Sequence, residues 1–135
     1  MDYISWSENL SVGVSQFDEE HQQLVSFVND LNNALKIGAA SKTMESILVH
    51  LVKYTVIHFN NEEHLMKLHN YPDFDNHKKA HDELTFQVND FYSRLQSGKA
   101  SFSLELLTFL KDWLTKHILG SDMAYKEFFS AKGVK

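Results

Sequence analysis

The chain has 135 residues, long enough for a buried core, and we expect residues 1–135 to form a single domain. Its net charge is −5 with neutral histidines, which argues against nucleic acid as a partner, because nucleic-acid-binding proteins present a basic face. It has no cysteine, so disulfides and thiolate metal ligands are excluded, and any metal must be bound through nitrogen and oxygen.

The first half of the chain predicts an N-terminal arm followed by two helices. The first 17 residues form the arm, whose apolar side chains would lie along the rest of the domain. Between Asp18 and Leu35, apolar residues and one histidine recur at alternating steps of three and four, the period of an amphipathic helix, and Gly38 follows as a stop. A second helix is predicted from about Ser41 to His69, ahead of Pro72, because proline disfavours helical geometry in the residue before it.

The second half predicts two more long helices and a short one. The third helix spans Phe74 to Leu95, with the same alternation of steps, and Gly98 ends it. The fourth runs from about Phe102 to Leu119, before Gly120, and a short helix from Asp122 to Phe129 packs back on the others. The chain is therefore predicted to be all-α, an up-down-up-down four-helix bundle with an N-terminal arm and a short C-terminal helix.

The sequence shows no signal for export or for membrane insertion. The segment Met1 to Trp6 has neither the basic region nor the apolar stretch of a secretory signal, and no window approaches the roughly 18 apolar residues of a membrane span. We therefore expect a cytoplasmic protein with no membrane span. Since no large exposed apolar seam is evident, we also expect a monomer.

Polar residues interrupt the inward-facing seams of all four predicted long helices. They are His21, His58, Glu62, His77, His81 and His117. A carboxylate buried without a partner is costly, and each buried histidine still needs hydrogen-bond partners. A single such histidine is more often a satisfied core residue than a ligand, but six polar residues converging from four helices indicate a metal site.

The spacing within two of the helices supports this interpretation. His58 with Glu62, and His77 with His81, are pairs four residues apart. In an α-helix this spacing brings two side chains to within about 40° of one another. Each pair can therefore present two ligands to one centre.

Asp122 is a further candidate ligand. It lies five residues after His117, too far round a regular helix to share a face with it. Gly120 lies between them, so we expect the helix to end or bulge there and to turn the carboxylate inward. Spacing alone supports this residue less strongly than the other six.

The candidate ligands are too many for one ion. Five imidazoles and two carboxylates, with no Glu-x-x-His motif, are richer in nitrogen than the ferritin-like di-iron sites. Imidazole suits zinc, copper, iron and nickel, so the ligand types leave the metal open. If two octahedral ions share both carboxylates and one oxide or hydroxide, a single position remains free for a small ligand. This position would face the apolar residues Leu24, Leu114 and Ile118, which would exclude water.

Four segments of the chain resemble the hemerythrin family, and bacterial hemerythrins in particular. They are Asp18-Glu19-Glu20-His21-Gln22-Gln23-Leu24, His58-Phe59-Asn60-Asn61-Glu62-Glu63, Tyr71-Pro72 ahead of His77-x3-His81, and Trp113-Leu114-x2-His117-x4-Asp122. Together they span nearly the whole chain, and they fill all seven ligand positions of the family.

The resemblance implies a non-haem di-iron centre, with ferrous ions in the deoxy form and ferric ions in the oxy form. One iron would be held by His77, His81 and His117. The other, with the open position, would be held by His21 and His58. Glu62 and Asp122 would bridge the two ions beside an oxide or hydroxide.

The resemblance also implies which residues surround bound dioxygen. Trp113 and Leu114 would line the pocket, and Leu24 would control access to it. The remaining histidines, His50, His64 and His69, and also Glu63, fall off the inward seams and are expected to be solvated.

The expected function is reversible dioxygen binding, for storage, transport or delivery to an oxygen-consuming enzyme. A di-iron peroxidase is one alternative, ranked lower because the pocket offers no obvious acid or base for O–O cleavage. A sensor of dioxygen or nitric oxide is another, although the chain ends soon after the bundle with no signalling domain. The protein is therefore expected not to be an enzyme.

Overall fold

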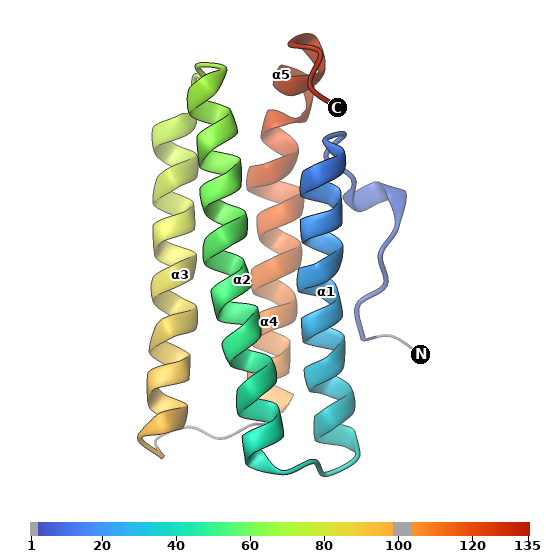
Figure 1. Cartoon of the computed structure of the whole chain (residues 1–135), viewed down its shortest axis with the longest axis vertical. Helices are drawn as coiled ribbons and strands as arrows, with labels where there is room; N and C mark the ends of the chain where they lie inside the picture. The colour runs from blue at the N-terminus through green and yellow to red at the C-terminus, as the bar shows by residue number, and fades with distance from the viewer. Residues whose placement is uncertain (1–2, 99–103) are drawn as a thin grey trace.

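Four long helices running alternately up and down dominate the computed structural model, which describes residues 3–98 and 104–135 (Figure 1). They are α1 (Ser15–Lys36), α2 (Ser41–Leu68), α3 (Phe74–Gln96) and α4 (Leu104–His117). Helix α1 packs against α2 and α4, and α2 also packs against α3. No strand occurs within the described ranges. The predicted all-α four-helix bundle is confirmed.

The helix boundaries follow the predicted ones to within a few residues. A 3-10 turn, η1 (Glu8–Leu10), precedes α1, which begins at Ser15 rather than Asp18. After α1, Gly38 has a φ of 67°, a left-handed conformation that glycine adopts without strain at a helix end. The predicted start of the fourth helix, Phe102, lies outside the described residues.

The C-terminal part differs from the prediction. Helix α4 ends at His117 and is followed by a π-helical turn, η2 (Ile118–Asp122), then by a 3-10 turn, η3 (Met123–Tyr125), and by α5 (Lys126–Ala131). The short C-terminal helix is therefore present, but it begins at Lys126 rather than at Asp122, because Asp122 belongs to the π turn.

Hydrogen bonds attach the N-terminal arm to α1 at two points. The Ile4 amide donates to Asn29 Oδ1 at 2.8 Å, and Asn29 Nδ2 donates back to the Ile4 carbonyl at 2.9 Å. Further along, the Asp18 carboxylate accepts hydrogen bonds from the Val12 amide at 2.8 Å and from the Ser11 hydroxyl at 2.6 Å. The predicted arm thus lies along the bundle.

Two hydrophobic clusters flank the buried polar residues. The larger fills most of the bundle between the long helices. The smaller joins the arm, the end of α2 and the C-terminal turns, through Val12, Val14, Phe17, Met66, Tyr71, Tyr125 and Phe129. Phe59 of the larger cluster stacks on His81 at 3.9 Å between ring centroids, and Phe17 of the smaller one meets His58 edge-on at 6.1 Å. None of the described helices is long and apolar enough to cross a membrane.

Candidate metal centre

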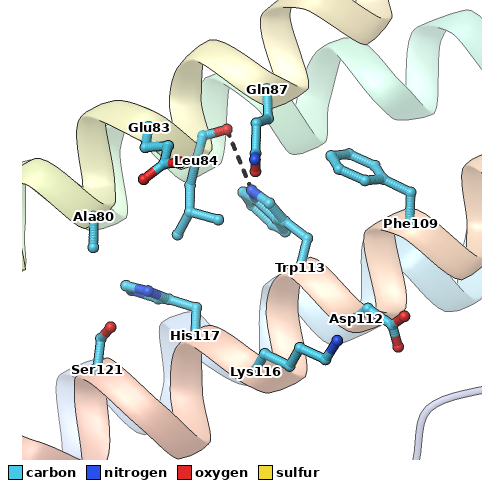
Figure 2. Close-up of a pocket in the computed structure, with 10 residues that line it drawn as sticks. All are labelled: Ala80, Glu83, Leu84, Gln87, Phe109, Asp112, Trp113, Lys116, His117 and Ser121. Carbon is cyan, nitrogen blue, oxygen red and sulfur yellow. Dashed lines mark hydrogen bonds between the residues drawn. The ribbon is translucent and has the colours of Figure 1, made fainter.

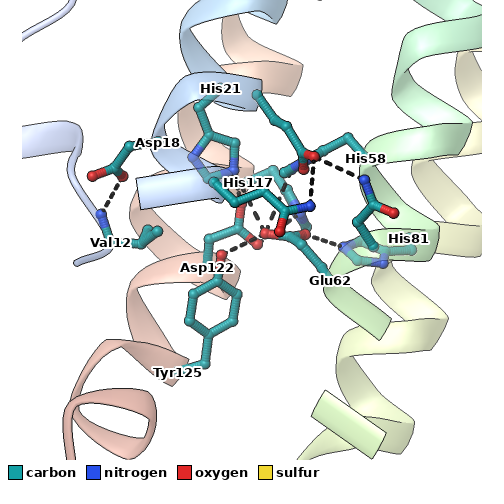
Figure 3. A network of polar contacts seen from close by, with 12 residues as sticks. Val12, Asp18, His21, His58, Glu62, His81, His117, Asp122 and Tyr125 are labelled. Atoms are coloured by element: carbon teal, nitrogen blue, oxygen red, sulfur yellow. Dashed lines mark hydrogen bonds and ion pairs between the residues drawn. The ribbon is translucent and has the colours of Figure 1, made fainter. Parts of the chain in front are cut away.

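All seven candidate ligands meet at one place inside the bundle, and all of them except His77 are labelled in Figure 3. They are His21 from α1, His58 and Glu62 from α2, His77 and His81 from α3, His117 at the end of α4, and Asp122 from η2. The most exposed of them, His117, is only 7% exposed. The centre is therefore buried and draws on every long helix.

Three histidines and both carboxylates form one group of ligand atoms. The Nε2 atoms of His77 and His117 each lie 3.0 Å from Asp122 Oδ1, and His81 Nε2 lies 3.0 Å from Glu62 Oε1. One ligand atom from each of the five residues falls within 4.8 Å of all the others. A single cation can contact all five.

The other two histidines form a second group with the same carboxylates. His21 Nε2 lies 2.9 Å from Asp122 Oδ2, and His58 Nε2 lies 3.5 Å from Glu62 Oε2. Each carboxylate therefore turns one oxygen to the three-histidine group and the other oxygen to the two-histidine group. This arrangement suits two cations bridged by Glu62 and Asp122.

The donor atoms of the centre lack hydrogen-bond partners. The Nε2 atoms of all five histidines, both Asp122 oxygens and Glu62 Oε1 are buried and unpaired. A buried polar atom left without a partner costs about 1–3 kcal/mol, so a cluster of them aimed at one place is unfavourable without a cation. The donor set of imidazole nitrogens and carboxylate oxygens therefore fits a pair of metal ions.

The charges inside the centre shift the pKa of its members strongly. Burial lowers the pKa of His21, but the neighbouring Asp122 and Glu62 carboxylates outweigh burial and raise that pKa to about 10. The same balance raises the pKa of His77 to about 9. Burial and the Glu62 charge act to raise the pKa of Asp122, yet the surrounding histidines, His117 foremost, hold it far below its usual value. Without metal, protons on His21 and His77 supply positive charge beside the two carboxylates.

The Asp122 prediction depended on a helix irregularity, and η2 provides it. The π-helical turn carries one more residue per hydrogen-bonded turn than an α-helix, which returns the fifth residue after His117 to the same face. Asp122 is fully buried there, although spacing gave it the least support.

Two carboxylates that hydrogen-bond to ligand histidines were given no role at the centre by the sequence analysis. Nδ1 of His58 donates to Glu20 at 2.6 Å, and Nδ1 of His81 donates to Glu63 at 2.7 Å. The expectation that Glu63 is solvated is wrong, because its side chain is only 15% exposed and faces α3. Each carboxylate fixes the proton on Nδ1 and leaves Nε2 free to bind metal. Both residues lie one position from a ligand and inside the segments that resemble hemerythrins, and these are the signals in the sequence that could have drawn attention to them.

Tyr125 is a third contributor, from the segment between Asp122 and Phe129 that the sequence analysis expected only to pack back on the other helices. Its hydroxyl donates to Glu62 Oε2 from the side of the smaller hydrophobic cluster (Figure 3). Burial, followed by the charges of Glu62 and Asp122, raises the pKa of Tyr125 well above its usual value. The hydroxyl therefore keeps its proton and holds the carboxylate in place.

A narrow apolar cavity adjoins the two-histidine group. Its lining residues are His21, Leu24, His58, Phe59, Leu84, Trp113, Leu114 and His117. Leu24, Trp113 and Leu114 are thus where the sequence analysis expected them. Ile118, which was expected there, does not line the cavity: its side chain is buried in the larger hydrophobic cluster. Phe59 and Leu84 occupy the wall instead.

The histidines outside the centre lie apart from it. His50 and His64 are exposed on α2. His69, at the end of α2, is half-buried beside Phe129, with 6.0 Å between ring centroids.

Comparison with known proteins identifies relatives over almost the whole chain. The family model described as "Hemerythrin HHE cation binding domain" matches residues 12–129. Myohemerythrin of Theromyzon tessulatum is 38% identical over 121 residues, which cover 90% of this chain and 89% of the relative. Bacteriohemerythrin of Stenotrophomonas maltophilia is 32% identical over 127 residues, covering 94% of this chain and 82% of the relative.

Solved structures agree with the sequence relatives. A crystal structure of wild-type hemerythrin superimposes with a TM-score of 0.85 at 28% identity, covering 93% of this chain and 96% of the other. A family model that spans most of the chain, relatives above 30% identity and the same bundle lead to one conclusion. The chain belongs to the hemerythrin family.

Proposed function

We propose that the protein binds dioxygen reversibly at a centre of two iron ions, for storage, transport or delivery of dioxygen. One observation carries the proposal: a three-histidine group and a two-histidine group share two carboxylates, and each carboxylate turns a separate oxygen to each group. The unequal number of histidines leaves one of the two positions with fewer protein ligands. The resemblance to hemerythrins supports iron as the metal.

The proposed ligand assignment follows the two groups. His77, His81 and His117 would hold one iron, His21 and His58 would hold the other, and Glu62 and Asp122 would be shared between the two ions. When bound, such a pair of ions would supply an open coordination position for dioxygen and two electrons that are lent to dioxygen on binding and returned on release.

The side chains around the two-histidine group favour binding over chemical conversion. Apart from histidines, the cavity there is lined by Leu24, Phe59, Leu84, Trp113 and Leu114, which exclude water and offer no carboxylate. Exclusion of water and ions protects a reduced metal pair against loss of electrons. We therefore propose a binding protein rather than a di-iron peroxidase, which would need an acid or base beside the bound substrate.

The cellular compartment, the oligomeric state and the partner of the protein are also proposals. We infer a cytoplasmic monomer that passes dioxygen to an oxygen-consuming enzyme. The absence of cysteine from the sequence agrees with a protein that does not depend on an oxidising compartment.

Iron content and a cycle of oxygenation test the proposal. The purified protein is loaded with ferrous iron without air, the iron per chain is measured, and the visible spectrum is followed while dioxygen is admitted and removed repeatedly. We expect two irons per chain and an absorption band that appears and disappears with dioxygen. His77→Ala should lose the band, whereas His64→Ala, at an exposed position, should keep it. One iron per chain, or oxidation that dioxygen removal does not reverse, would refute the proposal.

A further inference from the structure

Helices α3 and α4 form an open seam of the bundle. Along the described residues they approach each other less closely than the other neighbouring pairs of helices do. The surface over this seam is hollowed into a groove of about 450 Å³ (Figure 2). Ala80, Leu84 and Gln87 line it from α3, and Trp113 and His117 line it from α4.

The groove and the buried cavity share a wall. Leu84, Trp113 and His117 line both of them, with the groove on the solvent side and the cavity on the side of His21 and His58. A different hollow, between the N-terminal arm and α1, shares no residue with the cavity. The groove therefore lies one side-chain layer from the metal centre.

Within this wall, one weak hydrogen bond joins α4 to α3. Trp113 Nε1 donates to the Leu84 carbonyl at 3.3 Å, which is long for a hydrogen bond of this kind. This carbonyl lies inside α3, where it also serves as the acceptor for the amide one turn later. This hydrogen bond therefore adds little to the resistance against moving the indole, which comes mainly from packing in the larger hydrophobic cluster, and small side-chain displacements are fast compared with ligand binding.

We propose that dioxygen enters and leaves the centre between α3 and α4, past Leu84 and Trp113, with the groove as its mouth. The inference rests on the proposed function and names the path to that same site. Leucine and indole side chains let a small apolar molecule pass while they hinder hydrated ions, so the route itself selects for dioxygen. Trp113 is only 6% exposed, so the route is closed in this structure and passage requires the indole to move.

A substitution at the mouth of the route separates a path from a binding site. Ala80 lines the groove but not the cavity, so Ala80→Phe should obstruct passage without touching bound dioxygen. An added barrier slows entry and exit alike, so both rate constants should fall by the same factor, roughly tenfold, with the affinity unchanged. Lys79→Phe, at the neighbouring exposed position, is the control and should leave both rates unchanged. Stopped-flow mixing measures association, and trapping of released dioxygen measures dissociation.

The outcome is decisive in either direction. Unaltered rates in Ala80→Phe, or an altered affinity that comes from one rate alone, would overturn the proposed route. If Ala80→Phe loses iron or does not fold, Gln87→Phe obstructs the other end of the groove and is judged by the same criterion.

A fluorescence measurement tests the route without dioxygen binding. Trp6 and Trp113 are the two tryptophans, so Trp6→Phe leaves Trp113 as the single reporter, and zinc fills the centre without redox chemistry. Dissolved dioxygen quenches indole fluorescence on contact, and its quenching constant should fall several-fold when Ala80→Phe is added but not when Lys79→Phe is added. Reduced quenching in a protein whose iron form fails to bind dioxygen would keep the route and remove the proposed function. Unchanged quenching and unchanged rates in a protein that does bind dioxygen would remove the route alone.

Discussion

At the scale of single residues, the centre depends on side chains that do not touch metal. Glu20 accepts a hydrogen bond from Nδ1 of His58, and it also accepts hydrogen bonds from Asn61 Nδ2 at 2.8 Å and Gln16 Nε2 at 3.1 Å. Burial acts to raise the pKa of Glu20, but these hydrogen bonds, led by that from His58, lower it, so the carboxylate stays ionised. An ionised acceptor makes the opposite ring nitrogen a better ligand.

Replacing this acceptor should weaken metal binding. We expect Glu20→Gln to reduce the affinity for ferrous or cobaltous ions by about 10- to 100-fold, the usual effect of losing such a partner. Competition with a chelator of known affinity measures the change. Glu19→Gln removes the same charge from an exposed neighbouring position, and equal affinities in the two variants would contradict the role given to Glu20.

Protons and metal ions should compete for the histidines. In the metal-free protein His21 and His77 have pKa values raised to about 10 and about 9, so near pH 7 both rings are protonated and must lose those protons to bind metal. We expect roughly two protons to be released from these residues near pH 7. Metal affinity should rise with pH and level off above about pH 10, once His21 is neutral without metal. Calorimetry in buffers of different ionisation enthalpy counts the protons, and an affinity independent of pH would contradict this reasoning.

At the scale of elements, the π turn is the feature that completes the centre. From the sequence, the irregularity after α4 is attributed to Gly120, but the structure gives a different reason for this π-helical turn. Gly120 does not have a left-handed φ, and a Cβ added there would meet nothing within 4 Å. The turn is therefore not forced by glycine, and we attribute it to the interior position of the Asp122 carboxylate.

A pair of glycine substitutions tests this explanation. Gly120→Ala should keep the metal centre and raise the free energy of unfolding by about 0.4–1 kcal/mol, because alanine restricts the unfolded chain more than glycine does. Gly38→Ala should lower it by about 1 kcal/mol or more, because Gly38 has a φ of 67°. Denaturant unfolding of both variants measures the difference. Loss of metal from Gly120→Ala would show that the glycine itself shapes the turn.

The periodicity of the sequence predicted the helices well, because alternating steps of three and four residues report directly which face is buried. The same periodicity found the six ligands that sit on those faces. It could not find Glu20 and Glu63, since each lies one step off the buried face and is drawn inward only by a histidine of another helix. It also placed Ile118 in the cavity, because a helical wheel continues through residues that the structure assigns to a π turn.

At the scale of the whole molecule, the centre lies between two hydrophobic clusters and joins all four long helices. In the metal-free protein, the five histidine Nε2 atoms, both Asp122 oxygens and Glu62 Oε1 are buried without hydrogen-bond partners, and only protons on the histidines offset the carboxylate charges. The cost of these atoms falls on the folded state alone, since the unfolded chain exposes them to water.

Removal of metal should therefore destabilise the entire bundle. A ligand present at 100 times its dissociation constant stabilises the folded state by about 2.7 kcal/mol, and tighter binding adds more. We expect the thermal unfolding midpoint to fall by several degrees after treatment with a chelator and to recover when ferrous iron is returned without air. Identical midpoints for the two forms would contradict a structural contribution from the metal.

The order of the ligands along the chain has a consequence for biosynthesis. Both ligand groups require Asp122, whereas the earliest ligand is His21, so neither group is complete until Asp122 has left the ribosome. A nascent chain that exposes only α1 to α3 offers four histidines and one bridging carboxylate, an incomplete set. We therefore expect the complete centre to bind metal only after Asp122 has been synthesised, and a fragment that stops before Asp122 should fail to retain two ions.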